Sequence, residues 1–187
     1  GQSAGASVTT GVQNTLIGGL AGDALTDADY NVAVGKSSLS ADTLGSKSTA
    51  VGYETLAAQN FTSATDSFNV AVGYQSGTSV TTGVRNILIG GLAGDALTDA
   101  DNNVAIGYQA LTTDTVGSRS VAVGTSALRF QATSSAADVY NVAVGHAAGE
   151  AVTTGVQNTL IGGLAGDAIT TGYGNEALGY SALSANT

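Results

Sequence analysis

The chain of 187 residues contains no cysteine, proline, methionine or tryptophan, and it has one histidine. The lack of cysteine excludes a disulfide framework and any thiolate metal site. A metal site built from several imidazoles is excluded as well, because His146 has no second histidine to join it. No apolar stretch is long enough to cross a bilayer, so we expect no membrane insertion by this segment.

Charge is scarce and one-sided. Five basic residues stand against fourteen acidic ones, which gives a net charge of −9, and only 10% of residues are charged. A negative chain of this kind is repelled by nucleic acids and by anionic membrane surfaces, so neither is an expected partner. The surface must instead be polar without being ionic, which suits a rigid, protease-resistant extracellular fibre.

The chain is built from repeats. The block NxLIGGLAGDA begins at Asn14, Asn86 and Asn158, so it recurs with a constant 72-residue period. A fixed period of this kind indicates a stack of similar units. We therefore interpret residues 1–187 as one elongated array with super-repeats 14–85 and 86–157, a partial super-repeat 158–187 and a partial unit 1–13.

Each super-repeat divides into shorter units, which we call rungs. A rung begins with Asn or Ser, continues with two or three small apolar residues and then has Gly. The usual spacing between rungs is a 17-residue one, and every fourth rung is a 21-residue rung that carries a short insertion. The rungs begin at Asn14, Asn31, Ser48, Asn69, Asn86, Asn103, Ser120, Asn141, Asn158 and Asn175.

The 17-residue rung predicts an all-β parallel β-solenoid (a β-roll). With the initial Asn as position 1, positions 2 to 4 form a short β-branched run that Gly ends at position 5, which indicates a strand and a turn. Thr at position 13 and Gly at position 15 predict a second strand and a second turn. Stacked rungs pair at about 4.8 Å, so about ten rungs give a rod roughly 50 Å long.

Two positions are expected to shape the corners. Glycine at position 5 suits a tight corner that needs positive φ or close backbone approach. Asn at position 1 suits a ladder of side-chain amides at the opposite corner. The corner glycines are Gly18, Gly35, Gly52, Gly73, Gly90, Gly107, Gly124, Gly145, Gly162 and Gly179.

Position 3 carries a prediction about partners. It is Ala or, in the rungs that begin at Asn14, Asn86 and Asn158, Leu. A strand that is apolar on both faces is buried on both faces. We therefore expect one face to pack on a partner chain, most simply an identical chain related by closed rotational symmetry. The alternative is that position 3 points into a wider core of a single chain.

Catalysis has little support in the sequence. His146 stands at position 6, where other rungs have Tyr53 or Thr125, and a catalytic base does not belong at a freely varied position. Gly35-Lys36-Ser37 imitates the end of a phosphate loop, but Tyr30 replaces the glycine that the motif requires. We expect the protein not to be an enzyme.

Ligand binding is the alternative function. Aspartates cluster in two equivalent rungs with the alternating oxygen ligands that calcium favours, although a solvated acidic corner has the same composition. These weak calcium candidates are Asp23, Asp27, Asp29, Asp95, Asp99 and Asp101. No other cofactor is indicated. A column of Thr at position 13, from Thr9 to Thr187, could bind ice, but a turn ladder of bonded hydroxyls is the favoured interpretation.

The insertions are candidates for contact with a receptor or another partner, because loops on a rigid scaffold commonly carry recognition. They lie near residues 59–68 and 131–140, about four rungs apart. Their aromatic residues are Phe61, Phe68, Phe130 and Tyr140. The alternative interpretation is that these rings seal the wider rung.

The rungs 103–111 and 141–145, with the spacer 153–155, resemble the YadA-like head repeats of trimeric autotransporter adhesins. They are equally similar to repeats in phage tail fibres and large bacterial surface proteins. The resemblance implies a left-handed β-roll, a homotrimer and a role in attachment at a bacterial cell surface or on a virion. The 72-residue period and the 21-residue rungs depart from the family's shorter, more uniform repeats. Because the chain begins and ends within a rung, we expect it to be a section of a longer array.

Overall fold

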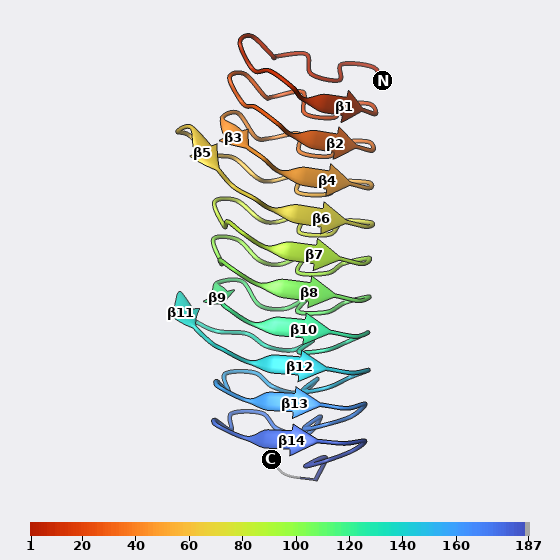
Figure 1. Ribbon diagram of the computed structural model, residues 1–187, viewed down its shortest axis with the longest axis vertical. Helices are drawn as coiled ribbons and strands as arrows, with labels where there is room; N and C mark the ends of the chain where they lie inside the picture. Colours follow the sequence, from red (N-terminus) through yellow and green to blue (C-terminus); the bar gives the residue numbers. More distant parts are fainter. Residues whose placement is uncertain (186–187) are drawn as a thin grey trace.

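In the computed structural model, which describes residues 1–185, the chain is all-β and those residues contain no helix. It winds as a parallel β-solenoid of about ten turns with the 17-residue spacing that the sequence predicts. Ten strands of three residues each stack into one sheet along the rod (Figure 1). They are β1 (Thr15–Ile17), β2 (Val32–Val34), β4 (Thr49–Val51), β6 (Val70–Val72), β7 (Ile87–Ile89), β8 (Val104–Ile106), β10 (Val121–Val123), β12 (Val142–Val144), β13 (Thr159–Ile161) and β14 (Glu176–Leu178).

Neighbouring strands of this sheet pair in parallel without any slip between rungs. Position 3 of one rung lies opposite position 3 of the next, as Leu88 lies opposite Ala105. Because side chains alternate across a strand, this register places the same rung position on the same side of the sheet along the whole rod.

The remaining four strands are short and lie on the other side of the coil. β3 (Gly45–Ser46) pairs with β5 (Thr65–Asp66), and β9 (Gly117–Ser118) pairs with β11 (Ala137–Asp138). In Figure 1, β5 and β11 stand out from the rod, where the insertions widen the rung.

The predicted second strand therefore forms only beside an insertion. In other rungs the position-13 segment is irregular, but it is still bonded from rung to rung. The Thr98 backbone N–H donates to the Thr115 carbonyl at 2.8 Å, and the Thr98 hydroxyl donates to the same oxygen at 3.0 Å. The threonines thus bond along the stack, and Thr187 lies outside the described residues.

Position 3 points into the coil, so the prediction that this position packs against a partner chain was wrong. From Ala33 to Leu160, every position-3 side chain is fully buried inside its own chain. The side chains on the outside of the sheet are those at positions 2 and 4. The coil is thin, and alanine suits it because the opposite wall lies close.

The three rungs with Leu at position 3 keep the interior filled in a different way. Leu88 occupies space that glycine leaves at position 9 of its own rung, Gly94, and of the preceding rung, Gly77. Where position 3 is alanine, position 9 is leucine in five of the seven rungs, as at Leu39 and Leu111. The NxLIGGLAGDA block is thus a layer of core packing inside one chain.

The position-5 glycines combine positive φ with close approach between rungs. Gly107 has φ of +136°, and a Cβ on it would lie 2.5 Å from the carbonyl carbon and oxygen of Gly124. Position-5 glycines at neighbouring rungs touch in the same way, so the corner repeats with the stack.

The Asn at position 1 fixes the opposite corner. The Asn86 side-chain amide donates to the Ala100 carbonyl of its own rung at 2.8 Å. Its Oδ1 accepts the backbone N–H of Asn103 in the next rung at 2.9 Å. One side chain therefore closes its rung and also joins it to the next rung.

The rungs with insertions begin with Ser, and a buried glutamine replaces the missing amide. Gln59 donates to the Ser48 hydroxyl at 3.0 Å and to the Asp42 carboxylate at 2.6 Å, and its Oε1 accepts from the Asn69 side chain at 2.9 Å. Gln131 makes the same three bonds in the second copy. Asp42 also accepts the backbone N–H groups of Gly45 and Phe61, which anchors the insertion.

Candidate interaction surfaces

The outer face of the ten-stranded sheet is apolar along nearly its whole length. Position 4 carries Val, Ile or Leu in every strand of the sheet. These side chains are partly or largely exposed: 57% of Ile17 and 38% of Ile161 is accessible. The column comprises Ile17, Val34, Val51, Val72, Ile89, Ile106, Val123, Val144, Ile161 and Leu178.

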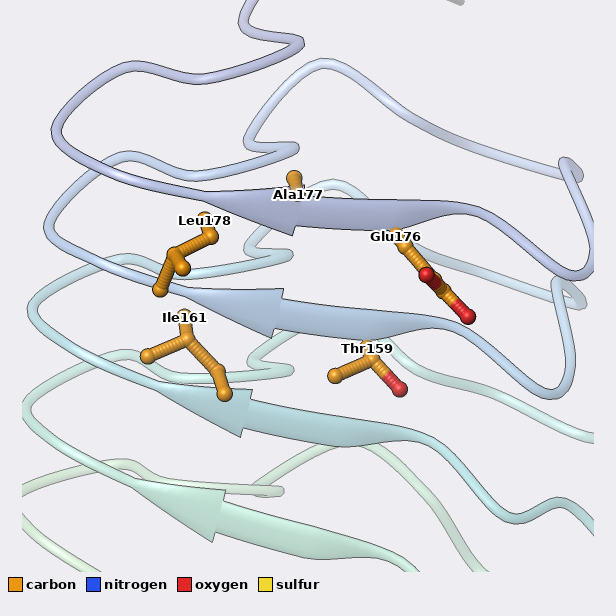
Figure 2. A pocket seen from close by; sticks show the side chains of 5 residues that line it. All are labelled: Thr159, Ile161, Glu176, Ala177 and Leu178. Atoms are coloured by element: carbon orange, nitrogen blue, oxygen red, sulfur yellow. The ribbon is translucent and has the colours of Figure 1, made fainter.

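Position 2 forms a second outward column beside the first. It is Val or Ile in the six rungs at Val32, Val70, Ile87, Val104, Val121 and Val142, and Thr in three others. Glu176 is the one charged side chain of the two columns in the described sheet. Figure 2 shows this end of the face, where Ile161 and Leu178 lie side by side and, with Thr159 and Glu176, line a shallow pocket.

A flat β-branched face of this kind has the character of a contact surface. A sheet that is apolar on both faces is normally covered on both faces. Isolated exposed apolar residues are ordinary, but a continuous apolar strip marks an interaction site. The outer face, defined as the side chains at positions 2 and 4 in the strands of the ten-stranded sheet from β1 to β13, is therefore the first candidate surface.

The four aromatic residues of the insertions divide between the two predicted roles. Phe61 is 5% exposed and packs on Gly45, where an added Cβ would lie 2.7 Å from the ring, so it seals the wider rung. Phe68, Phe130 and Tyr140 are each almost half exposed. A cation lies over each of these three rings, at 5.3 Å for Lys47 on Phe68.

The predicted calcium ligands mostly bind their own chain. Asp29 and Asp101 each accept a backbone N–H of the preceding rung, from Val12 and Val84, at 2.8 Å. The Asp27 carboxylate accepts the Thr10 hydroxyl at 2.6 Å. Within residues 1–185 no three acidic or histidine side chains come together as a metal site would require.

The three aspartates of the NxLIGGLAGDA block lie half inside the coil. Burial raises the pKa of Asp95, although a hydrogen bond from Thr112 opposes that shift. At the equivalent Asp23 and Asp167, one carboxylate oxygen is buried without a hydrogen-bond partner among the described residues. A buried carboxylate oxygen without a partner lowers stability.

The residues at position 6 form an exposed column that contains aromatic, basic and other side chains. The rings of Tyr53 and Tyr74 stack with centroids 5.4 Å apart, and the Lys36 ammonium lies 5.6 Å from the Tyr53 centroid. A hydrogen bond from Gln75 lowers the pKa of Glu54, and a hydrogen bond to Glu54 raises the pKa of Tyr53. His146 stands exposed in the same column. Lys36 thus caps an aromatic stack, a role unrelated to the phosphate-loop pattern.

Two features were missed by the sequence reasoning. Where position 3 changes from Ala to Leu, position 9 is Gly and not Leu. Residues compensate in size like this when they share a core, so the pattern places position 3 inside. Positions 2 and 4 must then point outward. The ion pair between Lys47 and Asp66 depends on the fold of the insertion, which no local pattern indicates.

The part of the chain that the structure describes has no helix with the length and apolar character that a membrane span requires. No protein-family model, curated protein or solved structure matches this chain.

Proposed function

We propose that this chain is a rigid structural and adhesive section of an extracellular or virion fibre. In this proposal three identical left-handed coils pack side by side through their outer faces. The observation that supports it is the outer face itself, a branched aliphatic column that continues through every rung from Ile17 to Ile161.

The spacing of that face favours an identical partner. Its side chains recur at about 4.8 Å along the rod, once per rung. A partner that covers all rungs must present apolar groups at the same spacing over the same length. A second copy of this chain meets that condition without further assumption, and closed rotational symmetry lets each copy use the same face.

A fibre section of this kind suits attachment. Backbone hydrogen bonds join the rungs along the rod, and Asn side chains, or Gln in the inserted rungs, add to them, so the rod is stiff and presents its edges at fixed spacing. Weak contacts repeated along three such chains would give avidity that a single rung lacks. The resemblance to adhesin and tail-fibre repeats points to the same role. The calcium alternative gains no support from Asp27, Asp29 and Asp101, whose carboxylates accept hydrogen bonds from the chain.

Mass measured in solution tests the proposal. We expect the parent chain to have the mass of a trimer. The double variant Val104→Asp with Val121→Asp places two charges in the middle of the outer face, so we expect it to have the mass of a monomer. The matched control is Thr113→Asp, which adds charge at an exposed residue away from the sheet. A stable 18.2 kDa monomer of the parent chain would contradict the proposed assembly.

A further inference from the structure

One exposed edge of the rod collects cations and aromatic rings. We call it the edge column: the residue that immediately precedes position 1 of each rung. It holds three of the five basic residues of the chain and three exposed aromatic residues. From the second rung to the ninth, it comprises Tyr30, Lys47, Phe68, Arg85, Asn102, Arg119, Tyr140 and Gln157.

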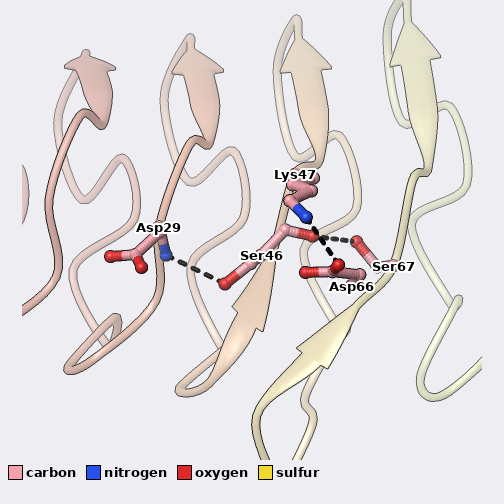
Figure 3. Close-up of polar contacts among 5 residues, drawn as sticks. All are labelled: Asp29, Ser46, Lys47, Asp66 and Ser67. Carbon is pink, nitrogen blue, oxygen red and sulfur yellow. Dashed lines mark hydrogen bonds and ion pairs between the residues drawn. The ribbon is translucent and has the colours of Figure 1, made fainter.

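Beside each insertion the edge column forms a compact group of three side chains. The Lys47 ammonium lies 2.5 Å from Asp66 Oδ2 and 5.3 Å from the centre of the Phe68 ring. Figure 3 shows the Lys47–Asp66 pair next to Ser46 and Ser67, which bond the insertion to the neighbouring rung. We call this group, and its equivalent below, an edge triad.

The second edge triad is built from Arg119, Asp138 and Tyr140. The Arg119 guanidinium pairs with Asp138 and lies 5.8 Å from the centre of the Tyr140 ring. The Tyr140 hydroxyl donates to Asp138 Oδ2 at 3.2 Å. The two triads stand four rungs apart, about 19 Å along the rod.

The two triads keep their chemistry while other residues of the inserted rung change. Between the two copies of the inserted rung, Tyr53 becomes Thr125 and Glu54 becomes Ser126. The triad nevertheless keeps a cation, an aspartate and an aromatic ring. Core packing does not explain this, because roughly half of Phe68 and Tyr140 is exposed.

The backbone of the edge column makes these side chains costly. All eight residues have φ between +50° and +63°. A side chain in this conformation costs about 1–2 kcal/mol that glycine avoids. The same conformation occurs at buried core residues such as Leu39 and Leu111, so it belongs to the corners of the coil. The case for a role of the edge side chains therefore rests on their chemistry and exposure.

The chemistry of the triads selects the partner. Each offers a half-exposed ring beside a cationic donor and a carboxylate acceptor, and the cation and the carboxylate cancel in charge. Asp101, whose carboxylate accepts the backbone N–H of Val84, lies close to Arg85, and the chain as a whole carries −9, so a polyanion is repelled. A sugar ring presents an apolar C–H face for stacking and hydroxyls that both donate and accept.

We propose that the edge triads bind a neutral polysaccharide, one sugar ring stacking on Phe68 and another on Tyr140. This inference rests on the proposed adhesive function and names its partner class. Two sites per chain at a fixed separation add avidity when a long polymer reaches both.

An immobilised array of neutral, sialylated and sulfated oligosaccharides tests the inference, followed by calorimetric titration with the neutral oligosaccharide retained. We expect neutral glycans to bind, and Phe68→Leu with Tyr140→Leu to weaken that binding by about tenfold or more, since tenfold corresponds to about 1.4 kcal/mol. Leucine keeps apolar bulk but removes the ring. The control Phe130→Leu changes an exposed ring outside the edge column and should leave binding unchanged.

Retention of only acidic glycans, or of none, would overturn the inference. The inference would also be overturned if the double variant melted at a lower temperature but bound neutral glycans as the parent does. The rings would then only stabilise the fold of the insertion. Solution mass of the same samples separates this result from the proposed assembly: a trimer that binds no glycan refutes the triads alone, whereas a monomer refutes the fibre.

Discussion

Leu88 fills the space beside Gly94 so closely that a Cβ on this glycine would lie 2.7 Å from Leu88 Cδ2. The pair recurs in every fourth rung and, together with the insertion, gives the sequence a 72-residue period although most rungs have 17 residues. The thin interior is filled in two ways along the rod: by leucine at position 3, which also fills the space beside the glycine of the preceding rung, or by leucine at position 9.

The first prediction concerns exchange of the large and the small side chain between positions 88 and 94. Leu88→Ala alone should cost about 2–5 kcal/mol of unfolding free energy, because it opens a cavity in the core. Gly94→Leu alone should cost about 1–3 kcal/mol through overpacking. The double variant recreates the Ala33–Leu39 arrangement and should be more stable than the sum of the two losses predicts. Denaturant titration of all four proteins measures this coupling, and simple additivity would contradict the packing argument.

The second prediction concerns the glycine corner. Gly107→Val combines an unfavourable φ with a clash against Gly124, so it should misfold the stack locally and cost more than about 4 kcal/mol. Gly179→Val is the matched control: its φ is +124°, but no described atom lies within 4 Å of the added Cβ. It should lose only the strain, about 1–3 kcal/mol. Equal losses, read from melting curves and hydrogen exchange, would show that close approach is unimportant.

The buried glutamine of the insertion rung gives the third prediction. Gln131→Ala leaves the Asp114 carboxylate, the Ser120 hydroxyl and the Asn141 amide each short of a buried partner. The expected loss is about 2–4 kcal/mol. Gln157→Ala, at an exposed position, should change stability by less than about 0.5 kcal/mol. Thermal unfolding of the two variants makes the comparison, and a neutral Gln131 variant would refute the network.

The fourth prediction is a dependence on pH. The pKa of Asp95 is raised by burial, so the folded state holds this proton more tightly than the unfolded chain does. The carboxyl therefore favours folding at low pH, and this contribution is lost as the pH rises through the folded-state pKa. Asp95→Asn removes the titration, should raise the melting temperature at pH 7, and should make no difference well below pH 3.8, where the parent is also neutral. A lower melting temperature at pH 7 would contradict the desolvation argument.

The rung, its spacing and the parallel solenoid could be predicted from the sequence, because Asn and Gly recur at positions where only their chemistry fits. The direction of position 3 could not. Val-Ala-Val has apolar residues on both sides, so the pattern does not tell which side is inside until the compensation between Leu88 and Gly94 is recognised. The edge triads were also missed, because Lys47 and Asp66 meet only through the path of the insertion. The spacing of the rungs does not predict how the inserted residues fold.

Within residues 1–185, each rung forms hydrogen bonds only with the rungs directly before and after it. A genetic duplication of one 72-residue cassette would therefore lengthen the rod by about 19 Å without disturbing any existing contact. Deletion of a single residue inside a 17-residue rung would instead leave one coil too short to align with either neighbour. The length of the rod can thus change in steps of one 72-residue repeat, and every added repeat contains another rung with an insertion.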